Sequence, residues 1–247
     1  MITFKSKDDF NKMSKAGKAV RNIHEEVYDK AKEGVSLKEL DLVAKKVIEA
    51  SGCQSNFLGY RGYPAYTCIS PNDVIVHGIP SDYKLNDGDV LSVDAGAIFE
   101  GLHADAAFTC GIGKISDEAK ELIDKTKYAL EEAIKLVDIG QSLGTIGHKI
   151  KSIGENHSYG VVKEYIGHGI GFEMHEDPQV PNYGEKGIGL KLKEGMAICI
   201  EPMFNLGSAE TSLEEDNWTV KTKDGSLSAH FEHTIGITSD GIEVFTQ

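Results

Sequence analysis

The sequence predicts an α+β fold in which two similar halves, about residues 1–112 and 113–247, form one domain. Helix-like and strand-like segments alternate along the chain in two rounds. Short stretches of the first round recur in the second, and no low-complexity segment or long linker separates them. If the halves arose by duplication, a pseudo-twofold arrangement would bring equivalent strands together at the centre.

Two helices are expected in each half, over residues 7–33, 36–51, 116–138 and 142–156. The second is the best defined, because Ser36 and Glu39 can form a capping box before apolar residues at helical spacing. Sequence rich in turns and β-formers follows each helix pair.

The stretch "SVDAGAIFEGLHADAAFT" predicts a β-hairpin with its turn at Glu100 and Gly101. A two-residue turn pairs residues whose numbers sum to an odd total, so Asp94 and Asp105 fall on one face, about 5–8 Å apart. Two carboxylates this close share a proton or hold a cation. The alternative, a surface hairpin with two solvated acids, is disfavoured by the apolar flanking residues.

Four short stretches repeat in the same order. "LNDGDVLSVD", ending at Asp94, matches "LKEGMAICIE", ending at Glu201, and "HAD", ending at Asp105, matches "HFE", ending at Glu232. "SLKEL" matches "SLGTI" at two helix starts, and "HGIP" matches "HEDP". Duplication would therefore bring four acids on apolar strands together.

Four carboxylates cannot stay ionised in a dry cleft without cations, because each buried charge costs several kcal/mol. His168 in "GHGIG" adds an imidazole between glycines that allow close backbone approach. Such a mixed set suits Mn, Fe, Co or Zn. His77 and His175 precede turn-forming prolines, as residues at a pocket rim often do. For most of the other histidines an ordinary structural role is expected.

Composition limits the classes of function. The formal net charge of −13 disfavours nonspecific nucleic-acid binding. No apolar run of about 18 residues exists, and "MITFKSKDDF" lacks a signal-peptide core. The four cysteines contain no C-x-x-C pair, which argues against a zinc ribbon or a disulfide framework. We expect a cytoplasmic protein that binds neither membranes nor specific nucleic-acid sequences.

The motifs resemble those of a known family, the type I methionine aminopeptidases of bacterial form, over essentially the whole chain. The motifs are "VHGIP", "SVDAG" with "HAD", "EYIGHGIG", "HEDPQVPNY", "CIEPM" and "WTVKTKDGSLSAHFEHT". The resemblance implies the pita-bread fold, a single catalytic domain with a central antiparallel sheet covered by two helix pairs. It also implies removal of initiator methionine from nascent polypeptides when the second residue is small. A monomer that meets its substrates at the ribosome is expected.

The resemblance further implies two divalent ions, drawn from Co, Mn, Fe, Zn or Ni. Asp94 would chelate one ion, and Asp105 and Glu232 would bridge both. His168 and Glu201 would complete the second site.

By the same resemblance, Glu201 would be the general base, His175 would stabilise developing charge, and His77 would orient the scissile amide. The first substrate residue would lie against an apolar wall formed by Tyr60, Tyr63, Cys68, Met174 and Trp218. For Cys68, ordinary core packing is an equal alternative. The chain departs from many members of the family, which carry an aromatic residue in place of Met174 and a histidine in place of Arg61. It also departs at Phe172 and Glu173, and these differences affect pocket shape.

Three other functions fit the sequence less well. A proline-specific aminopeptidase shares the fold and metal set but usually has an additional N-terminal domain, and "GYRGYP" argues against it. A noncatalytic binding module would have lost metal ligands, and all five are present. A 2-His-1-carboxylate oxygenase needs an open triad rather than four acids.

Overall fold

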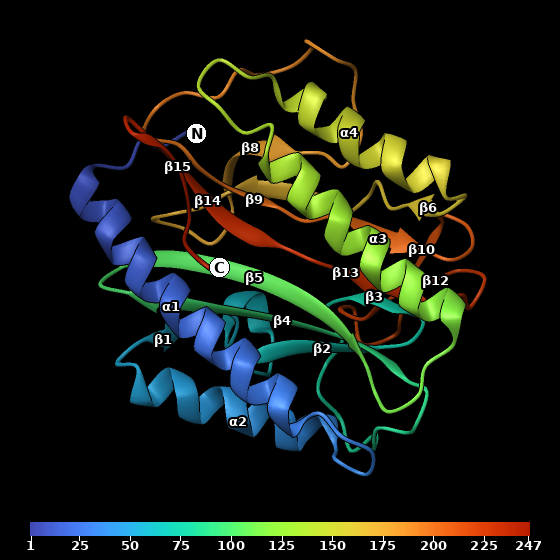
Figure 1. Ribbon diagram of the computed structural model, residues 1–247. Coiled ribbons are helices and arrows are strands. Elements are labelled where there is room, and N and C mark those ends of the chain that lie inside the picture. The colour runs from blue at the N-terminus through green and yellow to red at the C-terminus, as the bar shows by residue number, and fades with distance from the viewer.

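The computed structural model describes residues 1–247 and contains four long helices that cover a set of antiparallel strands (Figure 1). The helices are α1 (Lys7–Lys30), α2 (Leu37–Ala50), α3 (Asp117–Ile134) and α4 (Leu143–Asn156). All four begin within one residue of the predicted starts. The first and third end three and four residues early. After α1 the Gly34 amide donates to the Leu85 carbonyl rather than within the helix, and after α3 the Leu136 and Val137 amides close tighter turns on Ala133 and Ile134.

The strands are short except in the first half. They are β1 (Gln54–Ser55), β2 (Thr67–Pro71), β3 (Val74–Val76), β4 (Val90–Phe99), β5 (Leu102–Gly111), β6 (Gly160–Val161), β7 (Gly167–Gly169), β8 (Glu176–Val180), β9 (Ala197–Ile200), β10 (Met203–Asn205), β11 (Thr211–Leu213), β12 (Val220–Thr222), β13 (Ser228–His230), β14 (His233–Thr238) and β15 (Gly241–Val244). A single 3₁₀ turn, η1 (Tyr60–Gly62), precedes β2.

Strands β4 and β5 form the predicted hairpin. Glu100 and Gly101 have φ values of 47° and 81°, the left-handed pair that a tight hairpin turn requires. Asp94 pairs with Ala107, and Gly96 pairs with Asp105. The two aspartates therefore lie on one face, as predicted, because side chains alternate along each strand.

Two sheets meet at the centre of the molecule. One contains β1, β4, β2 and β5, and the other has the order β15-β14-β9-β7-β8. Ala107 and Glu232 exchange backbone hydrogen bonds of 3.3 and 2.9 Å, and the Thr234 hydroxyl donates to the Asp105 carbonyl at 2.7 Å. These bonds place β5 beside the start of β14, so equivalent strands of the two halves are neighbours.

The starts of α2 and α4 are held to the chain before the following strands by matching hydrogen bonds. In each half, one amide before α2 or α4 and one at the first residue of that helix donate to carbonyls shortly before β4 or β9. The bonds are Gly34 to Leu85 (2.8 Å) and Leu37 to Tyr83 (3.1 Å), then Gly140 to Leu192 (2.8 Å) and Leu143 to Leu190 (2.9 Å).

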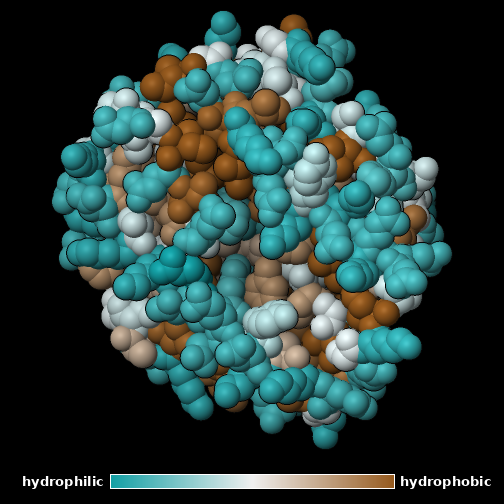
Figure 2. Space-filling view, viewed as in Figure 1, coloured by the Kyte–Doolittle hydropathy of each residue, from teal (hydrophilic) through white to brown (hydrophobic).

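Each helix pair buries its own apolar core against the strands. Ile23 and Leu40 of α1 and α2 pack on Leu91 and its neighbours, and the α3–α4 pair packs in the same way on the second sheet. A fully buried aliphatic side chain contributes about 1.5–3 kcal/mol. The surface on the helix side is mainly hydrophilic, with small apolar patches between the polar residues (Figure 2). No helix combines the length and apolarity needed to cross a membrane.

Candidate metal centre and substrate pocket

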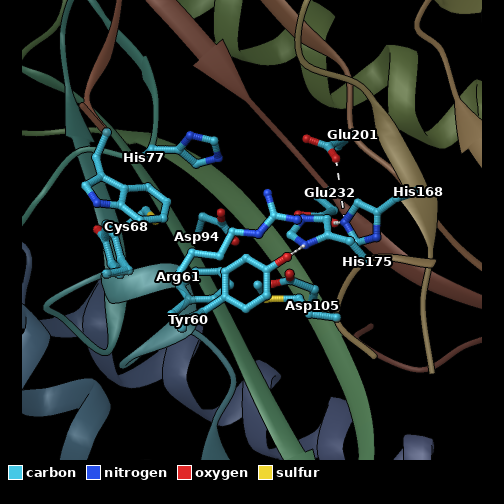
Figure 3. Close-up of a pocket in the computed structure, with 14 residues that line it drawn as sticks. Tyr60, Arg61, Cys68, His77, Asp94, Asp105, His168, His175, Glu201 and Glu232 are labelled. Atoms are coloured by element: carbon cyan, nitrogen blue, oxygen red, sulfur yellow. Dashed lines mark hydrogen bonds and ion pairs between the residues drawn. The ribbon is translucent and has the colours of Figure 1, made fainter. Parts of the chain in front are cut away.

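A pocket of about 350 Å³ lies on the face of the strands turned away from the helices (Figure 3). All twelve predicted site residues line it, together with Phe57 and Arg61. The predicted members are Tyr60, Tyr63, Cys68, His77, Asp94, Asp105, His168, Met174, His175, Glu201, Trp218 and Glu232. The structure thus brings together residues from both halves of the chain.

Asp94 and Asp105 of the β4–β5 hairpin lie close to Glu232, which directly precedes β14. Ligand oxygens of Asp94, Asp105 and Glu232 all lie within 4.8 Å of one another. Asp105 and Glu232 are buried, and one oxygen of each of the three acids has no hydrogen-bond partner. Buried carboxylate oxygens that no donor satisfies are costly unless a cation compensates them.

The second group of ligands surrounds Glu201, which follows β9. His168 in β7 places its Nε2 3.8 Å from Glu201 Oε1 and 4.0 Å from Glu232 Oε1. Its Nδ1 lies 2.9 Å from the Gly169 carbonyl oxygen, to which it can only donate. That bond leaves the Nε2 lone pair facing the carboxylates, as in a metal-ligating histidine.

His230 is the site residue that the sequence interpretation missed. Its Nε2 lies 3.5 Å from Glu201 Oε2, and His230, Glu201 and Glu232 form one of the potential metal-binding groups. A signal was present, because His230 stands two residues before Glu232, and residues at that spacing in an extended chain share a face.

Burial and mutual repulsion oppose full ionisation of these acids. Burial raises the pKa of Asp94 to about 7. Burial, and then the charges of neighbouring acids, raise the pKa values of Asp105 and Glu232 well above their usual range. Glu201 differs, because the contact with His230 and the nearby imidazoles outweigh burial and lower its pKa. A cluster of carboxylates with imidazole is therefore short of positive charge, and the residues fit divalent cations such as Mn, Fe, Co or Zn.

Two further histidines flank the acids. The Tyr60 hydroxyl lies 2.9 Å from His175 Nδ1, and the ring centroids of His175 and His168 are 4.3 Å apart. Burial lowers the pKa of His175 to about 4 and also lowers the pKa of His77. Both rings are therefore neutral near pH 7, and each can donate one hydrogen bond.

The remaining wall is apolar. Phe57, Tyr63, Cys68 and Met174 pack together, and the Trp218 ring meets Tyr63 edge-on at 5.0 Å between centroids. The Tyr63 hydroxyl donates to the backbone carbonyls of β2 and its neighbouring loop, so it faces away from the cavity. Burial raises the pKa of the Cys68 thiol, which keeps it neutral and apolar in character.

The loop that carries Met174 and His175 is anchored by a buried ion pair that the sequence did not reveal. Lys5 Nζ lies 2.6 Å from Glu176 Oε2, and the two side chains are 1% and 4% exposed. Glu176 Oε1 accepts from the Phe172 and Glu173 amides at 2.7 and 3.1 Å. One carboxylate thus joins the N-terminal segment to the base of the pocket wall.

Comparison with known proteins identifies the family. The sequence pattern of metallopeptidase family M24 matches residues 11–239. The chain belongs to metallopeptidase family M24. Methionine aminopeptidase 1 of Bacillus subtilis is 43% identical over 247 residues, with 100% of both chains covered. The methionine aminopeptidase of Mycoplasma capricolum is 46% identical over 249 aligned residues, which cover 100% of this chain and 99% of that relative.

Solved structures of M24 enzymes share the fold. The crystal structure of methionine aminopeptidase from Thermotoga maritima has a TM-score of 0.98, with 42% identity and complete coverage of both chains. The prolidase from Pyrococcus furiosus has a TM-score of 0.79 at 22% identity, and the alignment covers 99% of this chain and 65% of that one. This M24 chain therefore has the pita-bread fold, and it is a metal-dependent aminopeptidase.

Proposed function

We propose that the protein removes the N-terminal methionine from nascent polypeptides whose second residue is small. The observation that carries the proposal is a single pocket in which a cluster of carboxylates and imidazoles lies beside an apolar wall, with room for a methionine side chain. Full-length similarity to methionine aminopeptidases supports it. The prolidase likeness extends to the fold alone, so it does not favour a proline-specific enzyme.

We propose that the centre holds two divalent ions. Asp94 would hold one, Asp105 and Glu232 would contact both, and His168 and Glu201 would complete the second site. Bound ions would supply Lewis-acid activation of water and of the scissile carbonyl. The close approach of the ligand atoms and the unsatisfied carboxylate oxygens support this assignment.

Glu201 would act as the general base. Its lowered pKa keeps it ionised near neutral pH, whereas burial favours the protonated form of the other three acids when the site holds no cation. An ionised carboxylate beside the reacting water can accept its proton and pass it to the leaving amine.

The two flanking histidines would bind the scissile amide. When His175 Nδ1 accepts from the Tyr60 hydroxyl, Nε2 carries the proton and can donate to the developing oxyanion. His77, which is partly buried and neutral, would orient the amide from the other side of the acids.

The pocket wall accounts for methionine selectivity. A linear thioether side chain can lie against Met174, Cys68 and Trp218, whereas a branched side chain would have to displace packed residues. Overpacking by about 1–3 kcal/mol corresponds to roughly a 5- to 150-fold loss in rate. We expect similar losses for a bulky second residue, because it would push against the pocket mouth.

The proposal is tested by kcat/KM across Met-X-Ser and Z-Ala-Ser peptides with metal-loaded enzyme. Met-Ala-Ser should be cut well, Met-Leu-Ser and Leu-Ala-Ser poorly. Faster cleavage of Ala-Pro than of Met-Ala would instead indicate a proline-specific enzyme. Equal rates for Met-Ala-Ser and Met-Leu-Ser would contradict the closed pocket.

We also propose that the enzyme acts as a cytoplasmic monomer on chains emerging from the ribosome. Four cysteines without a disulfide support a reducing compartment. Light scattering of the purified protein and its co-sedimentation with translating ribosomes would test these points.

A further inference from the structure

Arg61 lies at the mouth of the pocket without a partner. The chain has 26 lysines and arginines against 39 acids, and only Arg21 and Arg61 are arginines. Arg21 donates to the Gln247 carbonyl oxygen at 2.9 Å and lies 4.0 Å from Glu25. The Arg61 guanidinium forms no hydrogen bond or ion pair, although it lines the pocket that contains four carboxylates. Its one defined contact is the Tyr60 ring, 5.4 Å from the guanidinium carbon.

The backbone holds Arg61 in this place. Arg61 has φ 47° and ψ 27°, a left-handed conformation that is uncommon for residues other than glycine. The turn is closed by the Gly59 amide, which donates to the Tyr63 carbonyl at 2.8 Å, and by the Tyr63 amide, which donates to the Tyr60 carbonyl at 2.9 Å. Figure 3 shows the side chain extending across the front of the cleft toward His175.

The platform under the guanidinium is also fixed. The Tyr60 hydroxyl is hydrogen-bonded to His175, and the two rings are 5.4 Å apart. A guanidinium on an anchored aromatic face keeps its N–H donors directed outward. Arg61 therefore presents a planar set of N–H donors to the part of a bound peptide that extends out of the pocket mouth.

We propose that Arg61 is a substrate-binding residue that recognises a carboxylate on the third residue of the peptide. The inference rests on the proposed function, in which the substrate amine and first side chain occupy the interior. The second residue is small and uncharged, so the nearest carboxylate that the peptide can offer is on residue three. It is either an acidic side chain or, in a tripeptide, the terminal carboxylate. Arginine binds such a group through two parallel N–H donors.

The expected effect is modest, because the pair is partly exposed. An exposed ion pair of this kind corresponds to about a two- to fivefold gain in kcat/KM. Salt should weaken it, since at about 0.5 M the screening length falls below 5 Å. Binding that is equal in ground and transition states changes KM rather than kcat.

The experiment compares matched peptides on metal-loaded enzyme. Met-Ala-Ser is compared with its C-terminal amide, and Met-Ala-Glu-amide with Met-Ala-Gln-amide, at low and high salt. Variants are Arg61→Gln and Arg61→Lys, and Arg21→Gln is the control because it removes the other arginine far from the pocket.

The proposal expects both acid-to-neutral ratios of kcat/KM to exceed about two, mainly through KM, and to approach one in Arg61→Gln and at high salt. Arg61→Lys should retain part of the ratio, and Arg21→Gln all of it. Ratios of one or less in the unmodified enzyme, or unchanged ratios in Arg61→Gln, overturn the proposal. If none of the methionine peptides is cut, the proposed function itself fails and the role of Arg61 fails with it.

Discussion

The two halves carry equivalent acids in different surroundings. In the first half, Asp94 and Asp105 stand within two continuous ten-residue strands. In the second half, β9 has four residues and β14 has six, and Glu201 and Glu232 lie just outside them. We infer that the halves arose by duplication, which the matching hydrogen bonds at the two helix starts support.

The difference shows how one repeated hairpin can acquire two roles. The first half would supply only oxygen ligands to a metal, and its acids have raised pKa values. The second half adds His168, His175 and His230 around Glu201, and the pKa of Glu201 is lowered. We therefore propose that the acids of the first half serve mainly to hold cations, while the histidines added in the second half keep Glu201 ionised as a base.

The largest effect is expected at Glu201, where the halves differ most. Glu201→Gln should lower kcat by about 10²- to 10⁴-fold, because it removes the only one of the four pocket acids whose surroundings favour ionisation. The measurement is kcat on Met-Ala-Ser, with the melting temperature as a control for folding. Full turnover by the variant, or by chelator-treated enzyme, would refute the assignment.

Substitutions of Asp105 and Glu232, the proposed bridging acids, test whether each half contacts both ions. Asp105→Asn and Glu232→Gln should each weaken both metal-binding events in titration calorimetry, whereas Asp94→Asn should weaken one. Substitution of a residue that only supports a ligand typically lowers metal affinity by roughly 10- to 100-fold. Loss of a ligand itself should lower the metal affinity by more than that. Two unaltered events in either bridging variant would exclude the bridging role.

Substitution of Lys5 tests how far the stability of the second half depends on an ion pair with the first half. Lys5→Met leaves Glu176 buried without its cation, so the free energy of unfolding should fall by about 3–5 kcal/mol. The kcat/KM for Met-Ala-Ser should fall as well, because Glu176 holds the loop that carries His175. Lys38→Met is the control, since Lys38 pairs with Asp82 on the exposed surface. Equal denaturation midpoints for the two variants would contradict the anchoring role.

The raised pKa values predict a pH dependence in the metal-free protein. Between pH 7.5 and 8.5 the unfolded chain has lost its carboxyl protons, while burial and the neighbouring acids raise the pKa values of folded Asp105 and Glu232 and favour their protonated forms. The folded state then binds more protons, so stability falls as pH rises, by about 1.4 kcal/mol per pH unit for each proton. His24, whose pKa is lowered to about 3 by burial of its ring, is almost fully neutral in both states in this window. Urea unfolding of chelated protein measures the slope, and Asp105→Asn should flatten it.

The smallest expected effect concerns the two helix starts. Ser36 accepts from the Glu39 amide in a full capping box, whereas the Ser142 hydroxyl meets only the Thr145 hydroxyl. Ser36→Ala should cost about 1 kcal/mol of unfolding free energy, and Ser142→Ala less than about 0.5. A larger loss for Ser142→Ala would show that the second start relies on that buried contact.

Local patterns determined much of this protein. The helix starts, the two-residue turn at Glu100 and the shared face of Asp94 and Asp105 follow from capping and from the alternation of side chains, which act over a few residues. The family motifs then pointed to every residue that lines the pocket except Phe57, although Arg61 was expected only to affect pocket shape, and the adjoining His230 was missed. Asp94 and Asp105 stand on strands, where the alternation of side chains is simple, whereas residues outside strands, such as His77 and Trp218, were predicted from the motifs alone.

Tertiary structure alone decided what surrounds those residues. Lys5 and Glu176 are 171 positions apart, and nothing in either segment predicts their pairing. The distinction between Glu201 and the other acids likewise depends on His230 and His168, which packing brings to one side of the cluster. Burial and the positions of neighbouring charges set each pKa, and both are properties of the assembled fold rather than of any local stretch of chain.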